Sequence, residues 1–246
     1  MFEANLGGVF RLYRAAMKRC WLPSLLLALA WSWVAILVNR RLGSTDDLAA
    51  WLAQAQALMW SGYLWRLLVA AGALSALLYS TMVADIYAVA TGGATPAAAG
   101  FAAGLRAFPG VLVAATIFMV VTSMATALFI VPGAYLWGMW QLWLVVLVVE
   151  RSGPVTALTR SWQLVTGAWW RITTLVTVVT VVSAVPALVF DSLMGAILVL
   201  LGLDAAHAPA VMTVTGAILD VFLLPLVPAA LVAAYLDRQR APAQHG

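Results

Sequence analysis

The chain has 246 residues, of which 65% are hydrophobic and 9% are charged. Soluble domains carry about 25% charged residues, so this composition excludes an ordinary soluble protein and predicts an integral membrane protein. The 13 basic and 9 acidic residues give a formal net charge of +4. In a membrane protein such a balance indicates orientation and contact with anionic lipid, so we do not expect nucleic acid as a partner.

Six segments are long and apolar enough to cross a membrane, which takes about 20 residues of helix. The predicted fold class is therefore all-α and polytopic, with a single transmembrane domain over residues 1–246. The predicted spans are residues 20–38, 63–89, 108–130, 133–149, 170–190 and 209–235. The third and fourth spans are separated only by a turn at Val131 and Pro132, so we expect them to form a tight antiparallel hairpin.

The first, third and fifth spans each follow a segment whose apolar residues recur at helical spacing. Phe10, Tyr13 and Met17 show this spacing before the first span. The residues that show it before the third span are Phe101, Leu105 and Phe108. Apolar residues three and four apart share one face of a helix. We therefore predict three units, each an amphipathic surface helix on the cytoplasmic side followed by a two-span hairpin.

Two further apolar segments do not qualify as spans. Residues 48–61 show helical spacing and predict a surface helix on the outer side. Residues 192–203 are too short to cross and have three interpretations: a re-entrant piece, an interfacial helix, or an extension of the fifth span. Gly100 and Gly104 form a GxxxG pattern, to which we give little weight because it lies in a predicted surface helix.

The basic residues are distributed unevenly between the two sides of these spans. One side holds Arg11, Arg14, Lys18, Arg19, Arg106, Arg151, Arg160, Arg171, Arg238 and Arg240, and the other holds Arg40, Arg41 and Arg66. Short loops rich in Lys and Arg stay in the cytoplasm. The distribution therefore predicts that both termini are cytoplasmic.

Residues 150–171 combine four charged residues with three tryptophans. Gly153 and Pro154 predict a helix start, because proline at the first helical position loses no needed donor. The predicted apolar face consists of Val155, Leu158, Trp162, Val165 and Trp169. The predicted anchors in the inner interface are Leu158, Trp162, Val165, Trp169 and Trp170. We expect an amphipathic helix that lies in the inner leaflet and leads into the fifth span.

The same region carries a family resemblance. It rests on Pro132, Gly133, Glu150, Pro154, Ala157, Leu158, Ser161, Trp162, Leu164, Val165, Gly167, Trp169 and Trp170. This pattern resembles the signature of YciC-like bacterial inner-membrane proteins and of the membrane domain attached to some glycerophosphodiester phosphodiesterases. The resemblance covers residues 130–172 and implies a multi-pass protein of the bacterial inner membrane. The phosphodiesterase activity belongs to a separate soluble domain, which we do not expect in this chain.

One acidic residue is predicted near the middle of the membrane. Asp220 lies about halfway along the sixth span, at about 1.5 Å of helix per residue, and Pro225 frees the backbone carbonyl at Val221. The residues predicted at similar depth are Ser75, Thr116, Gln141 and Thr180. This polar layer has two interpretations: a proton or substrate site at a broken helix, or an acid that fixes helix packing.

Two further acids, Asp85 and Glu150, are predicted at the inner ends of their spans. The basic residues expected within their reach are Arg106, Arg160 and Arg171. One interpretation is a structural cluster of ion pairs that ties the surface helices to the bundle. The other is a headgroup site in which the arginines hold a lipid phosphate.

No HExxH, P-loop, GxSxG or paired-cysteine motif occurs in the chain, and Cys20 is its only cysteine. We therefore expect no cofactor and favour a non-enzymatic inner-membrane protein of envelope or lipid organisation, with an interfacial Arg and Trp platform for lipid or a protein partner. The alternative is a small transporter or channel-like protein that uses the layer around Asp220 as a homo-oligomer. A membrane-embedded enzyme ranks third.

Overall fold

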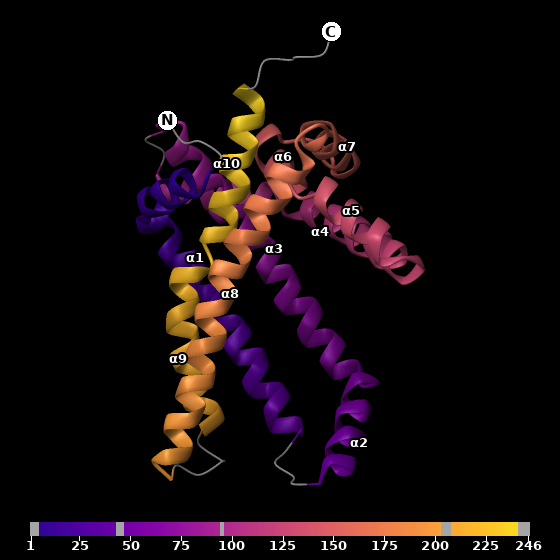
Figure 1. The fold of residues 1–246 in the computed structure, drawn as a ribbon, viewed down its shortest axis with the longest axis vertical. Coiled ribbons are helices and arrows are strands. Elements are labelled where there is room, and N and C mark those ends of the chain that lie inside the picture. Colours follow the sequence, from indigo (N-terminus) through magenta and orange to yellow (C-terminus); the bar gives the residue numbers. More distant parts are fainter. Residues whose placement is uncertain (1–4, 43–46, 94–95, 203–207, 241–246) are drawn as a thin grey trace.

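The computed structural model describes residues 5–42, 47–93, 96–202 and 208–240 (Figure 1). The structure is 90% helical, and no strand occurs in these ranges. In chain order the helices are α1 (Leu6–Leu42), α2 (Leu48–Met59), α3 (Gly62–Ala90), α4 (Ala97–Leu128), α5 (Ile130–Met139), α6 (Trp143–Glu150), α7 (Pro154–Val165), α8 (Trp169–Leu200), α9 (Ala208–Leu223) and α10 (Leu226–Arg240). The predicted all-α fold is confirmed.

Six segments of the described chain are long and apolar enough to cross a membrane, as predicted. Helices α1, α3, α4 and α8 each supply one span, whereas the fourth span consists of α5 and α6 and the sixth of α9 and α10. The protein is therefore a multi-pass integral membrane protein. Helix α2 is too short to cross, and none of its residues is buried, which agrees with the predicted surface helix.

The predicted repeat of three units is only partly present. The expected surface segments before the first and third spans run without a break into α1 and α4, and proline lies inside each helix at Pro23 and Pro109. Proline is tolerated within membrane helices because neighbouring groups satisfy the freed carbonyl. Of the three, α7 alone is a separate helix. Among the alternatives for residues 192–203, α8 shows an extension of the fifth span as far as Leu200.

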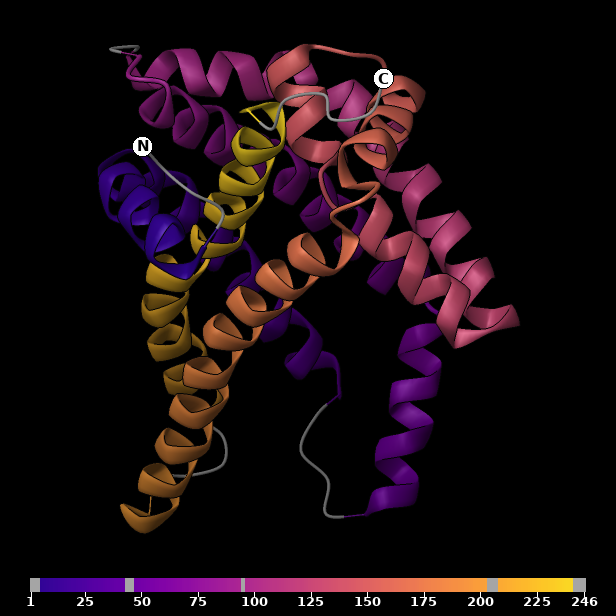
Figure 2. The same cartoon turned by 45° about the horizontal axis from the view of Figure 1, so that its top comes forward.

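Helices α4 and α5 form the expected antiparallel hairpin, which projects from the rest of the molecule (Figure 2). The chain turns at Phe129, whose extended backbone ends α4 and begins α5. This is two residues before the turn predicted at Val131. Both sides of the hairpin expose apolar side chains, as expected for helices in contact with lipid.

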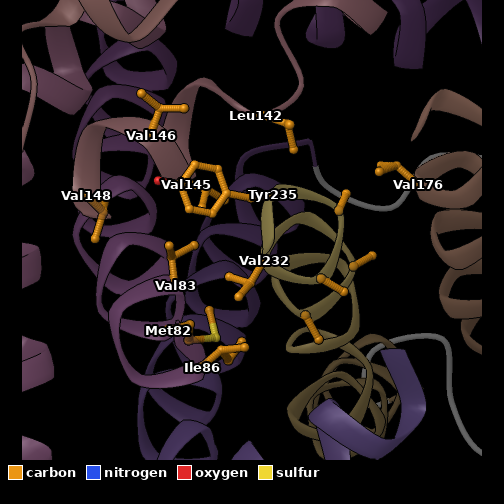
Figure 3. Packing of buried hydrophobic residues seen from close by; sticks show 14 of the residues in the cluster. Met82, Val83, Ile86, Leu142, Val145, Val146, Val148, Val176, Val232 and Tyr235 are labelled. Carbon is orange, nitrogen blue, oxygen red and sulfur yellow. The ribbon is translucent and has the colours of Figure 1, made fainter. Parts of the chain in front are cut away.

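The best-packed helix is α10, which contacts α1, α3, α6, α7 and α8. Its fully buried residues are Ala229, Ala230, Val232, Ala233, Ala234 and Tyr235. Small side chains allow helices to approach closely in a membrane, where no hydrophobic effect drives them together. Figure 3 shows Tyr235 and Val232 of α10 between Val83 of α3 and Val145 of α6.

Helix α1 begins and α10 ends at the same end of the molecule, and α7 lies at this end too (Figure 1). We call it the basic end. Its charged residues in the described ranges are Arg11, Arg14, Lys18, Arg19, Arg106, Arg151, Arg160, Arg171, Arg238 and Arg240, with the acids Asp85, Glu150 and Asp237. This end therefore has a large excess of positive charge.

Candidate functional site

Helix α7 packs on a break in the fourth span. The Ser161 hydroxyl donates to the Met139 carbonyl at 3.1 Å and accepts from the Leu142 amide at 3.1 Å, and Ser161 is fully buried. These two backbone groups lie where α5 ends and α6 begins. An unsatisfied buried polar group costs about 1–3 kcal/mol, so Ser161 stabilises both the break and the position of α7.

The buried face of α7 differs from the predicted face. Its buried residues are Ala157, Leu158, Ser161, Leu164 and Val165. Of the predicted anchors, Leu158 and Val165 therefore pack into the bundle, whereas Trp162 is 37% exposed. Val155, another residue of the predicted apolar face, is 61% exposed. The buried face lies further around the helix than the predicted face, because Ser161 must face the break between α5 and α6.

The two tryptophans that follow α7 have different environments. Trp169 is half-buried and its indole N–H donates to the Tyr135 carbonyl at 3.3 Å, so it ties the start of α8 to α5. Trp170 is 77% exposed. The ring of Tyr135 contacts Trp169 and Trp162, with centroids 5.6 Å and 6.0 Å away. This aromatic cluster lies where α5, α7 and α8 meet.

Several residues that carry the family resemblance hold these helices together. A Cβ at Gly133 would overlap the Thr126 side chain, and one at Gly138 would overlap the Trp169 ring, so both glycines permit close helix contacts. Gly167 has a φ of 80°, a left-handed conformation that favours glycine. The structure therefore gives these residues roles in packing and turning.

Two of the three acids at the basic end take part in ion pairs. Glu150 lies 3.7 Å from Arg160 and accepts a hydrogen bond of 2.9 Å from the Tyr235 hydroxyl. Asp237 lies 3.3 Å from Arg171. The first pair joins α6, α7 and α10, and the second joins α8 to α10. Both pairs are partly exposed, so each contributes about 1 kcal/mol or less to stability.

The third acid, Asp85, lies apart from these pairs. It is 3% exposed and lines a hollow of about 460 Å³ between α1, α3 and α4, together with Lys18 and Arg19. Neither Arg160 nor Arg171 lines this hollow, which we call the α1–α3 hollow. The predicted single cluster of acids and arginines is therefore divided in the structure.

The GxxxG pattern has more structural importance than its sequence position suggested. A Cβ at Gly100 would overlap the Asp85 carboxylate, and a Cβ at Gly104 would overlap the Thr81 hydroxyl. Asp85 and Thr81 are one helical turn apart on α3, as Gly100 and Gly104 are on α4. The two glycines therefore allow α4 to pack directly on α3. The segment lies within the continuous helix α4 and not on a separate surface helix.

Arg106 lies in a different place again. With Arg151 it lines a hollow of about 270 Å³ between α4 and α6, which we call the α4–α6 hollow. Sequence reasoning counted Arg151 for orientation but did not select it as a site residue. Its position depends on the end of α6, where Arg151 adopts a φ of 53°, and no sequence pattern signals that conformation for an arginine.

The sixth span is broken after Asp220, as the position of Pro225 suggested. Helix α9 ends at Leu223 and α10 begins at Leu226. The Tyr13 hydroxyl of α1 donates to the Phe222 carbonyl at 2.9 Å, so a side chain satisfies backbone next to the break. The predicted free carbonyl was that of the neighbouring Val221.

The hydroxyl groups of the predicted polar layer bond mainly within their own helices. Ser75, Thr116 and Thr180 each donate a hydrogen bond to the carbonyl four residues earlier in their own helix. Ser75 also accepts a hydrogen bond of 3.1 Å from the Trp31 indole of α1. Gln141 is buried, and its amide has no hydrogen-bond partner among the described residues.

Within the described ranges, no group of three or more His, Cys, Asp or Glu side chains could hold a metal ion. No protein-family model, no curated protein and no solved structure matches this chain.

Proposed function

We propose that this protein is a non-enzymatic protein of the bacterial inner membrane that organises anionic lipid, with its basic end as an interfacial platform for lipid or a protein partner. The observation that carries this proposal is the charge of the basic end. Among the described residues of this end there are ten basic side chains and three acids, and two of the acids are already engaged by Arg160 and Arg171. Anionic headgroups would supply the missing negative charge, at about 1 kcal/mol per basic residue near the surface.

Exposed tryptophans at the same end support an interfacial position. Trp162 and Trp170 project from the bundle beside the basic residues. Thr159 and Gln163 are exposed on the side of α7 that faces away from the bundle. Tryptophan side chains prefer the headgroup level of a bilayer because one part of the ring system is apolar and the N–H is polar. We therefore place α7 at the headgroup level of the cytoplasmic leaflet, with both termini in the cytoplasm.

The proposal is tested by measuring which lipids the purified protein retains. Native mass spectrometry in mixtures of phosphatidylglycerol and phosphatidylcholine should show preferential retention of phosphatidylglycerol. The double variant Arg11→Gln and Arg14→Gln should weaken this preference severalfold. The matched control is Arg40→Gln with Arg66→Gln, which removes the same charge at the other end of the molecule. Equal retention of both lipids by the unchanged protein would contradict the proposal.

The orientation is tested separately by labelling. A cysteine introduced at Thr159, in a Cys20→Ser background, should react with a membrane-impermeant maleimide only after the cells are opened. Cysteine at Gln56 of α2, an exposed helix at the opposite end, is the matched control and should react from outside intact cells. Reaction at Thr159 in sealed cells would reverse the assigned sides.

The YciC-like resemblance is part of this proposal, since it implies the same location and topology. The phosphodiesterase activity of the related multidomain proteins is not proposed for this chain. Two of the residues that carry the resemblance, Ser161 and Trp169, join α5, α7 and α8.

A transporter or channel-like homo-oligomer is the second candidate function. The observation that favours it is the break of the sixth span just after Asp220, because broken helices near carboxylates form ion and substrate sites in transporters. Proton flux into proteoliposomes, followed with a pH-sensitive dye, tests this candidate. Asp220→Asn should abolish a flux that the unchanged protein supports. Absence of any flux in the unchanged protein would exclude this candidate and leave lipid organisation as the proposed function.

A further inference from the structure

The α4–α6 hollow combines two arginines with small and apolar side chains. It is lined by Ala103, Arg106, Ala107, Gly110, Leu147, Val148, Arg151 and Ser152. The four residues from α4 are spaced three and four apart and therefore share one face of that helix. On the other side, Leu147 and Arg151 are one helical turn apart at the end of α6. The small residues of α4 leave room between the helices, and each helix contributes one arginine.

The charge of this hollow is not balanced within the protein. No acidic residue lines it in the described part of the chain. The three described acids of the basic end are engaged elsewhere: Glu150 with Arg160, Asp237 with Arg171, and Asp85 in the α1–α3 hollow. Two guanidinium groups that share one hollow repel each other unless an anion lies between them. Arginine pairs of this kind hold carboxylates and phosphates through several charge-assisted hydrogen bonds.

Two further features of the chain after α6 add donors beside these arginines. The Ser152 hydroxyl is buried and has no hydrogen-bond partner among the described residues. Helix α7 begins at Pro154, and its N-cap residue Gly153 provides no side-chain cap for the first backbone N–H groups. The start of a helix carries a partial positive charge that favours anions. Both features lie within three residues of Arg151 along the chain.

We propose that the α4–α6 hollow binds the phosphate group of an anionic lipid, with Arg106 and Arg151 as its ligands. This inference rests on the proposed function, which supplies lipid at the basic end. The hollow of about 270 Å³ is smaller than pockets for whole ligands, which measure about 300–1,000 Å³, and suits a headgroup. Leu147 and Val148 give it an apolar wall, which a lipid can contact with its glycerol and first methylene groups and a free phosphate cannot.

Two single variants remove the proposed ligands without filling the hollow. Arg151→Gly removes one guanidinium and places glycine in the left-handed conformation that this residue adopts, so the fold is retained. Arg106→Gln removes the other guanidinium from an exposed position on α4. The matched control is Arg40→Gln, which removes one exposed positive charge outside the basic end and lines neither hollow.

The experiment is a titration of each purified protein with phosphatidylglycerol, read by native mass spectrometry, and a parallel titration with inorganic phosphate. We expect Arg151→Gly and Arg106→Gln each to weaken phosphatidylglycerol binding by about tenfold, and Arg40→Gln by less than twofold. Inorganic phosphate should bind at least tenfold more weakly than the lipid, because it does not contact the apolar wall.

Each other outcome overturns a defined part of the inference. If both hollow variants behave like Arg40→Gln while the unchanged protein still prefers phosphatidylglycerol, the hollow is not the site and the proposed function stands. If inorganic phosphate binds as tightly as the lipid and is lost in the same variants, the site serves free phosphate. If the unchanged protein shows no preference for phosphatidylglycerol over phosphatidylcholine, the proposed function itself fails.

Discussion

The two hollows at the basic end contain the same kinds of residue in different balance. The α1–α3 hollow contains Lys18 and Arg19 together with the buried carboxylate of Asp85. The α4–α6 hollow contains Arg106 and Arg151 and, in the described part of the chain, no acid. The protein itself neutralises charge in the first hollow, whereas the second requires an anion from outside.

The same helix, α4, contributes to both hollows through different faces. Gly100 packs on Asp85 and so closes the α1–α3 hollow from one side. Arg106, on a later turn of α4, lines the hollow between α4 and α6. The two hollows therefore differ in their local balance of charge, which a count of charges over the whole basic end does not show. The following predictions perturb one hollow at a time.

The largest effect is expected at the contact between α3 and α4. Gly100→Ala places a methyl group against the buried Asp85 carboxylate and should lower the free energy of unfolding by about 1–3 kcal/mol, because neither helix can move away without losing packing. Thermal unfolding in detergent, followed by circular dichroism, measures this change. The control is Gly72→Ala on α3, where a Cβ meets no atom within 4 Å and the free energy of unfolding should rise slightly.

A new acid should neutralise the α4–α6 hollow from within. Ala107→Asp places a carboxylate on the face of α4 that carries Arg106, and it should reduce phosphatidylglycerol retention by about tenfold because the carboxylate competes with the lipid phosphate. Native mass spectrometry measures the retention. Thr159→Asp adds the same charge on the exposed face of α7 and should change retention by less than twofold; equal losses in both variants would argue against local competition.

The reverse change should make the α1–α3 hollow resemble the other. Asp85→Asn keeps the shape of the side chain and removes the acid that faces Lys18 and Arg19, so one additional phosphatidylglycerol should be retained, with an increase in affinity of roughly fivefold. Lipid titration of Asp85→Asn combined with Arg151→Gly would isolate this new site. Unchanged stoichiometry would show that the two hollows differ in more than charge.

The smallest effect concerns the backbone at the end of α6. Arg151→Gly relieves a left-handed conformation that costs a residue with a Cβ roughly 1 kcal/mol, so the free energy of unfolding should rise by up to that amount while lipid retention falls. Arg151→Ala should lose retention without this gain, because alanine has the same Cβ. A fall in stability in the glycine variant would indicate that the Arg151 side chain serves mainly in packing.

The spans could be predicted from sequence because runs of apolar residues are set by the membrane itself. The start of α7 could also be predicted, since Gly153 and Pro154 indicate a helix start and the structure has it at Pro154. Which residues of α7 face the bundle could not be predicted, because this depends on the hydroxyl of Ser161, which bonds to backbone at the break between α5 and α6. Helical spacing predicted Trp162 as an anchor in the inner interface, and the structure leaves its side chain 37% exposed.

The candidate site depended even more on tertiary contacts. Asp85 was expected near Arg106, since both lie at the same end of their spans. The structure separates them, because Gly100 lets α4 pack directly on Asp85 and directs the next turn of α4 elsewhere. In the predicted polar layer, Ser75, Thr116 and Thr180 donate their hydroxyls within their own helices, so equal depth alone does not direct these side chains toward Asp220.

The Ser161 hydrogen bonds also make the position of α7 and the shape of the fourth span depend on each other. Any partner that drew α7 away from the bundle would leave the Met139 carbonyl and the Leu142 amide without these hydrogen bonds inside an apolar environment. One hydroxyl group therefore holds in place both a short helix and the break in a span.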